Sequence, residues 1–142
     1  MIKSGISQMS AGSCTDVGGY SERKEEDVIQ FQLSDERPTR EVLESIIRDG
    51  FIPSYCTACY RSGRTGDRFM KLAKSGQIHN TCTPNALMTL MEYACDYGDE
   101  SLIKEADHLA EKEISRIEKP SAREMTRERL ARIKAGERDL FV

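Results

Sequence analysis

The chain has 142 residues, a length typical of one domain with its own core, and its 21 basic and 24 acidic side chains leave a net charge of -3. This balance creates no strong field for nucleic acid or an anionic membrane, so the sequence predicts neither partner. No apolar run approaches the ~20 residues needed to cross a bilayer, and no apolar secretory segment stands at the beginning. An odd number of cysteines, five, favours free thiols or metal ligands over a disulfide framework. These features predict a cytoplasmic protein.

The first part of the chain is expected to hold two short strands. Residues 6–11 lead into a glycine-bearing loop at 12–19, and residues 28–33 are rich in side chains that suit strands. The charged segment 21–27 between them predicts a solvated loop.

From residue 38 onward, apolar residues recur at helical spacing. The strongest start signal is Thr83 as an N-cap with Pro84 at the first helical position, and Gly98 provides the stop. Residues 121–124 match a capping box, which predicts the start of the last helix. The pattern predicts helices over residues 38–50, 63–72 and 83–98. It also predicts a helix that begins at Asp99 or Ser101 and ends before Pro120, and a last helix over 121–135 that ends before Gly136.

Three cysteines carry the clearest chemical signal. Cys56 and Cys59 form a C-x-x-C pair, whose thiolates a single turn can direct at one metal, and Cys82 follows after 22 intervening residues. Cys82 precedes the predicted N-cap Thr83, where the helix dipole and free amides favour the thiolate form. We therefore predict a metal or iron-sulfur site with these three ligands. Cys95, within the predicted helix, is expected to be an ordinary buried thiol.

Spacing alone leaves the identity of the bound group open. His79 lies three residues before Cys82, so a Cys3His zinc site in a small interaction module is one alternative. Three cysteines without a fourth protein ligand suit instead a 4Fe-4S cluster with one iron open to an outside ligand. A third alternative is a helical protein with three unrelated buried thiols.

Several segments bring a family resemblance into view. Residues 6–20 and 30–35 resemble the end of the barrel in radical S-adenosylmethionine tyrosine lyases, a part shared by the thiamine-pathway lyase and the FeFe-hydrogenase maturase. Residues 52–66 together with 82–86 resemble the auxiliary cluster signature of the maturase, C-x2-C-x22-C. Residues 133–141 resemble its C-terminus, so the resemblance covers nearly the whole chain.

The resemblance implies an α+β fold that is mostly α. Residues 1–50 would supply the last strands of a radical S-adenosylmethionine (β/α) barrel, and residues 51–142 would form a helical domain for the auxiliary cluster. Residue by residue, Cys56, Cys59 and Cys82 take the ligand positions of an auxiliary 4Fe-4S cluster that carries an additional iron.

The resemblance also implies a reaction. In that family, the barrel's own 4Fe-4S cluster and S-adenosylmethionine cleave tyrosine, a carbon-carbon lyase reaction, to p-cresol and dehydroglycine. The auxiliary cluster turns the fragment into carbon monoxide and cyanide on iron, and the additional iron, bridged by a free cysteine molecule, is where an Fe(CO)2(CN) unit is assembled. Hydrogenase maturation proteins are the implied partners. Arg61 and Arg64 either offset the negative charge of cluster and cyanide or are ordinary surface ion-pair residues.

The main departure from the family pattern is the absence of its C-x3-C-x2-C motif for the radical cluster. The chain is therefore expected to be a fragment or a truncated reading frame that binds the auxiliary cluster but is inactive alone. It would need the missing barrel region, from the same or a separate chain, as a partner. Cut strand edges also predict poor solubility or self-association. Cys14 is a second departure, since the maturase usually carries a basic residue there.

Overall fold

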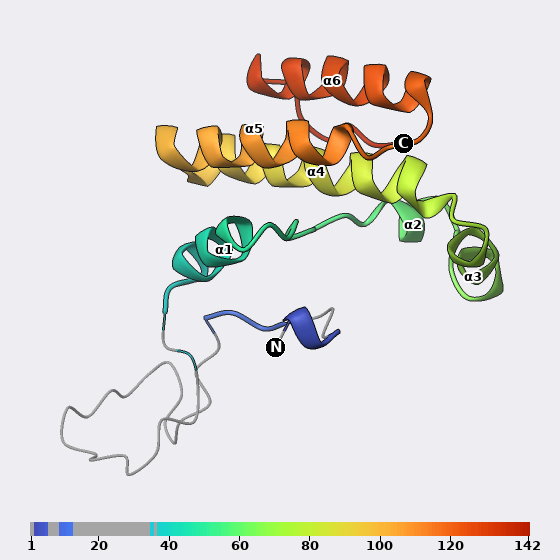
Figure 1. Cartoon of the computed structure of the whole chain (residues 1–142), viewed down its shortest axis with the longest axis horizontal. Coiled ribbons are helices and arrows are strands. Elements are labelled where there is room, and N and C mark those ends of the chain that lie inside the picture. The colour runs from blue at the N-terminus through green and yellow to red at the C-terminus, as the bar shows by residue number, and fades with distance from the viewer. Residues whose placement is uncertain (1, 6–8, 13–34, 36) are drawn as a thin grey trace, which may run out of the picture. The chain divides into compact units, whose positions relative to one another are not determined.

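The computed structural model describes residues 2–5, 9–12, 35 and 37–142 (Figure 1). Every regular element in this part of the chain is a helix, in agreement with the predicted helical character. The barrel strands that the resemblance implied are not seen among these residues. Contacts divide the chain into two units, 1–45 and 46–142.

Little of the first unit is described. Ile2–Ser4 form a short 3-10 helix, η1, and residues 9–12, which include part of the first predicted strand, form no strand. The second predicted strand, 28–33, and Cys14 lie outside the described residues. Helix α1, Thr39–Arg48, begins in this unit and continues into the second, close to the predicted range. The assignment of residues 1–50 to the end of a barrel stays a prediction.

The second unit is built around three longer helices. Helix α4, Ile78–Tyr97, packs against both α5, Glu100–Ile114, and α6, Pro120–Lys134 (Figure 1). Two short helices, α2, Ala58–Arg61, and α3, Asp67–Lys74, precede α4. No helix in the described part of the chain is long and apolar enough to cross a bilayer. The fully buried apolar side chains of these three long helices include Leu87, Met88, Leu90, Met91, Ala94, Leu102, Ala106, Ile114 and Ile133.

The start of α5 is confirmed and the start of α6 needs a correction. Asp99 is the N-cap of α5, and its carboxylate accepts a hydrogen bond of 3.0 Å from the Leu102 amide. Helix α6 begins at Pro120 with Lys119 as its N-cap, so the predicted capping box opened by Ser121 is wrong. The fixed φ of a proline suits the first helical position, which places the helix start one residue earlier.

The start of α4 also differs from the prediction. The helix begins at Ile78, so Pro84 lies inside it and Thr83 is not its N-cap. The first turn is held by hydrogen bonds from the His79 amide to the Gly76 oxygen and from the Asn80 amide to the Gln77 oxygen, of 3.2 and 3.0 Å. A proline in a helix removes one backbone donor without forcing an end, so the helix runs through it. Cys82 is therefore a residue within the helix.

Candidate metal centre

The C-x-x-C pair forms a tight turn at the start of α2. The Ala58 amide donates to Cys56 Sγ over 3.4 Å, and the Ala58 side chain is fully buried. This hydrogen bond fixes the position of the Cys56 sulfur relative to the turn. Cys59 lies in α2 itself, and both thiols are partly buried and free. The turn therefore presents two preorganised ligand positions from one short segment.

The end of α2 fixes Arg64 next to this turn. Gly63 has a φ of 62°, and its amide donates to the Tyr60 oxygen over 3.3 Å. The Arg64 amide donates to the Cys59 oxygen over 2.8 Å. This pair of bonds is a Schellman motif, whose left-handed residue is favourable for glycine. The backbone of Arg64 is thus bonded directly to the backbone of a predicted ligand.

Gly63→Ala tests that motif. A Cβ at Gly63 meets no atom within 4 Å, so the substitution acts through backbone strain alone. An alanine in the left-handed region costs about 1–2 kcal/mol, so we expect hydrogen exchange at the Arg64 amide to accelerate by about 10-fold. Nuclear magnetic resonance measures this rate. Gly76→Ala is the matched control, since Gly76 also has a positive φ and open space, and it should leave the Arg64 amide unchanged.

Helix α4 brings the third cysteine to the same place. Burial raises the pKa of the half-buried Cys82 thiol, while a hydrogen bond from Thr81 lowers it. The thiols of Cys59 and Cys56 raise this pKa further through their charges, and Arg64 lowers it. The expectation that a helix N-terminus would favour the Cys82 thiolate is wrong, because Cys82 lies within the helix and burial dominates. Cys59, Cys56 and Arg64 therefore lie near enough to Cys82 to act on its pKa.

Among the described residues, no three His, Cys, Asp or Glu side chains are close enough to hold one metal ion. The ligands of a zinc ion all lie within ~2.3 Å of it, whereas three cysteines on a 4Fe-4S cluster bind three different irons and lie further apart. His79, the fourth ligand of the zinc alternative, is exposed.

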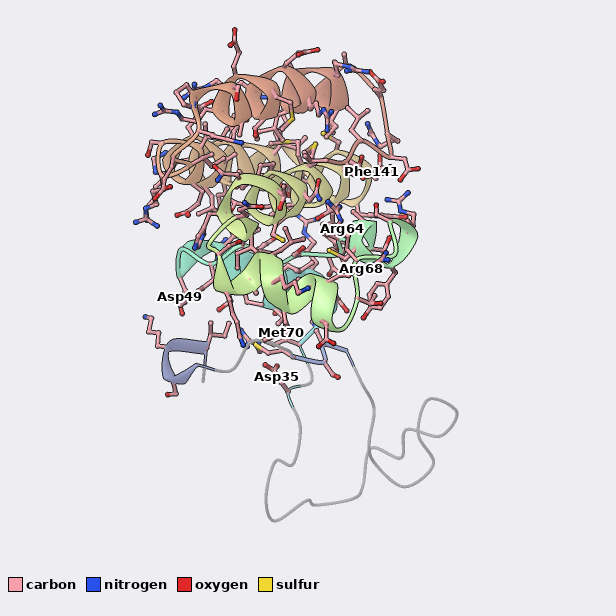
Figure 2. All side chains as sticks on the ribbon, turned by 90° about the vertical axis from the view of Figure 1, so that its right-hand side faces the viewer. Asp35, Asp49, Arg64, Arg68, Met70 and Phe141 are labelled. Carbon is pink, nitrogen blue, oxygen red and sulfur yellow. The ribbon has the colours of Figure 1, made fainter. Side chains whose placement is uncertain are left out.

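The two arginines of the cysteine loop have different contacts. Arg64 Nη2 donates to the main-chain oxygen of Val142 over 3.0 Å, while its buried Nε has no hydrogen-bond partner (Figure 2). Arg61 forms an ion pair of 2.6 Å with Asp139 and stacks over the Phe141 ring at 4.4 Å. Arg61 is thus an ion-pair residue, which was one of the two alternatives, whereas Arg64 acts on Cys82.

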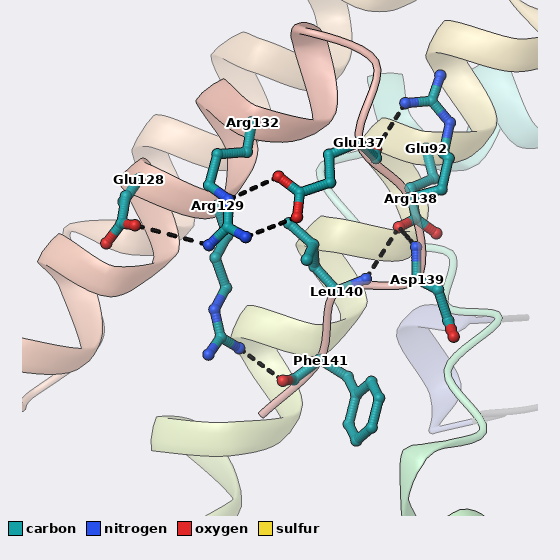
Figure 3. A network of polar contacts seen from close by, with 9 residues as sticks. All are labelled: Glu92, Glu128, Arg129, Arg132, Glu137, Arg138, Asp139, Leu140 and Phe141. Carbon is teal, nitrogen blue, oxygen red and sulfur yellow. Dashed lines mark hydrogen bonds and ion pairs between the residues drawn. The ribbon is translucent and has the colours of Figure 1, made fainter.

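The C-terminal segment, residues 137–142, makes contacts that the sequence did not predict. Arg138 pairs with Asp96 of α4 at 2.6 Å. The Asp139 amide donates to Glu92 Oε1 over 2.8 Å (Figure 3). Helix α6 holds the same segment from its other side. Its contacts are an ion pair of Arg132 with Glu137 and a hydrogen bond from Arg129 to the Phe141 oxygen, while Arg132 also pairs with Glu128 within α6 (Figure 3). The segment therefore lies along α4 and reaches both loop arginines.

Asn85 anchors the end of this segment. It is 3% exposed, its Oδ1 accepts from the Val142 amide over 2.7 Å, and its Nδ2 donates to the Val142 oxygen over 3.4 Å. The sequence predicted no contact for Asn85. Only the return of the chain at Gly136, with a φ of 105°, brings its partner into reach.

Asn85→Ala is expected to destabilise the chain by about 1–3 kcal/mol, because it leaves the part-buried Val142 amide without a partner and removes one of the two bonds to the Val142 oxygen. Urea unfolding followed by circular dichroism measures the change. Asn80→Ala is the control: Asn80 is only half-buried and accepts one bond of 3.3 Å from the Lys119 amide, so a loss below about 1 kcal/mol is expected. Equal losses in the two variants would contradict the anchoring role.

A cavity of about 380 Å³ borders one side of the centre. Cys56 and Arg61 line it, but Cys59 and Cys82 do not. Its wall includes Tyr93, which stacks on Tyr55 at 5.7 Å and contacts Tyr97 at 5.3 Å between ring centres. The cavity is therefore a neighbour of the three-cysteine site and not its interior.

Comparison with known proteins agrees with the resemblance. The crystal structure of HydG, a maturase of the FeFe-hydrogenase, matches with a TM-score of 0.83 and 52% sequence identity over 99% of this chain. The chain spans 30% of the length of that protein, consistent with a C-terminal part of it. No protein-family model and no curated protein matches the sequence. The predicted resemblance is thus confirmed for nearly the whole chain.

Proposed function

From the match to part of HydG, we propose that this chain serves in the maturation of an FeFe-hydrogenase by binding an auxiliary 4Fe-4S cluster through Cys56, Cys59 and Cys82. The observation that carries the proposal is the convergence of the α2 turn and α4, which puts these thiols within reach of one another and of Arg64. Neither element alone could supply three ligands. The spacing C-x2-C-x22-C supports the same assignment.

The three cysteines and Arg64 have different roles in the proposed centre. Cys56 and Cys59 hold two corners from one rigid turn, and Cys82 holds a third from α4, which leaves the fourth corner open. When bound, the cluster with its additional iron would supply the site at which carbon monoxide and cyanide are collected as an Fe(CO)2(CN) unit. The positive charge of Arg64 offsets part of the negative charge of a thiolate-bound cluster. Partial burial of the thiols restricts access of water.

The whole reaction requires more than this chain. We propose that the missing radical S-adenosylmethionine barrel region, with its own cluster, cleaves tyrosine and delivers the fragment to the auxiliary cluster. The proposal is supported by the 30% share of HydG that the chain spans and by the absence of C-x3-C-x2-C from its 142 residues. Other hydrogenase maturation proteins would then accept the product. The chain by itself should show no tyrosine lyase activity.

Anaerobic reconstitution of the full 142-residue chain with iron and sulfide tests the proposal. We expect about four irons and four sulfides per chain and, after reduction, an electron paramagnetic resonance signal of a 4Fe-4S cluster. Stoichiometric zinc in protein purified without added metal, lost in His79→Ala, would contradict the cluster and identify the zinc module instead. His108→Ala is the control, since His108 is the second histidine of the chain and lies in α5.

A further inference from the structure

Arg64 carries a buried donor for which the polypeptide supplies no acceptor. Among the described residues, the buried side-chain atoms without a hydrogen-bond partner are Arg64 Nε and Glu105 Oε2, and only the first is a donor. Buried N–H groups in proteins are almost always paired, so an unpaired one indicates an acceptor from outside the chain. A guanidinium is always charged, and the missing acceptor should therefore be anionic.

The Arg64 side chain is held at both ends. Its amide donates to the Cys59 oxygen over 2.8 Å, and its Nη2 donates to the Val142 oxygen over 3.0 Å. Val142 is itself anchored by the buried amide of Asn85. These contacts restrict the rotation of a long side chain that would otherwise sample many rotamers. The orientation of Nε is thus set before any group binds.

The position of Arg64 identifies the kind of acceptor. Its charge acts on Cys82, and its backbone is bonded to Cys59, so the guanidinium lies beside the three-cysteine site. The exposed arginine of the same region, Arg68 in α3, differs in being on the surface (Figure 2). The nearest anionic group that the site could hold is the cluster, whose thiolates and sulfides accept hydrogen bonds.

We propose that Arg64 Nε donates a hydrogen bond to a sulfur of the cluster held by Cys56, Cys59 and Cys82, an inference that rests on the proposed function. This hydrogen bond raises the reduction potential of the cluster. Reduction adds negative charge to the cluster, and a donor aimed at sulfur stabilises the reduced form more than the oxidised form. Lysine could keep the charge at this position but not the rigid planar fork that places Nε. Arg64 is therefore a positioning residue that tunes the cluster.

The experiment compares Arg64→Lys with the matched control Arg68→Lys in the reconstituted full chain. Redox titration followed by electron paramagnetic resonance should give a lower midpoint potential for Arg64→Lys and an unchanged one for Arg68→Lys. A chelator should remove the cluster about 10-fold faster from Arg64→Lys than from wild type. This is the low end of the effects seen when a residue hydrogen-bonded to a metal site is changed. Equal potentials and equal loss rates in wild type and Arg64→Lys would overturn the proposal.

A second measurement tests the proposal in the wild-type chain and does not depend on the folding of a variant. Protein labelled with 15N only in the arginine guanidinium group should show a 15N coupling to the reduced cluster by pulsed electron paramagnetic resonance. The coupling should persist in Arg68→Lys. It should be absent from folded Arg64→Lys. A wild-type chain that binds a cluster without this coupling would overturn the role of Arg64 alone. A wild-type chain that takes up no cluster would overturn the proposed function, and also the proposal that a cluster sulfur is the acceptor for Arg64 Nε.

Discussion

Cys82→Ser is expected to abolish cluster binding after reconstitution with iron and sulfide. Cys82 is the only proposed ligand from α4, so its loss leaves two ligands from one turn and frees a second corner of the cluster. Changes to residues that merely support ligands cost about 10–100-fold in affinity, and loss of a ligand should cost at least that much. Iron and sulfide analysis with electron paramagnetic resonance measures the result.

Cys95→Ser is the matched control for that experiment. Cys95 lies in the same helix, is also half-buried, and has a pKa raised mainly by burial. It packs against the apolar core and not beside the C-x-x-C turn. Its substitution should leave the cluster content unchanged. Equal cluster content in Cys82→Ser and wild type would show that the iron binds elsewhere.

Met88→Ala is expected to destabilise the chain by about 2–5 kcal/mol, the range for truncating a fully buried methionine. Met88 is 0% exposed in the centre of α4, where the helix contacts both α5 and α6. Such a loss is a large part of the about 5–15 kcal/mol that stabilises a typical domain. Urea unfolding followed by circular dichroism should show a lower midpoint.

Met70→Ala is the control for this core substitution. Met70 lies in α3 and is 47% exposed, so the same chemical change removes few buried contacts. We expect a change within about 0.5 kcal/mol, as for most surface substitutions. Similar midpoints for both variants would contradict the assignment of α4 as the centre of the core.

Local chemistry determined much of what the sequence could predict. The spacing of Cys56, Cys59 and Cys82 pointed to one site, and Asp99 and Gly136 marked a helix start and a helix end correctly. Signals of this kind depend on residues within a few positions of each other, such as a cap and the amide it serves. Helical periodicity is local in the same way, so the helical character of the second unit was predictable.

Local signals failed where two of them competed. Thr83 and Pro84 suit a helix start, but the chain is already helical from Ile78, and Pro84 is tolerated inside. Ser121 suited an N-cap, but Pro120 before it took the first helical position. In both cases a proline permitted two helix starts, and the packing of the surrounding helices decided between them.

By itself, the sequence determined that this chain is helical in its second part, and it predicted that three cysteines share one site. Only the tertiary structure decided the surroundings of that site. Arg64 meets Val142, 78 positions later, and Val142 meets Asn85, 57 positions earlier, because α4 and α6 pack together and the chain turns back at Gly136. Contacts at such separations depend on which helix faces meet, and no local pattern encodes that choice.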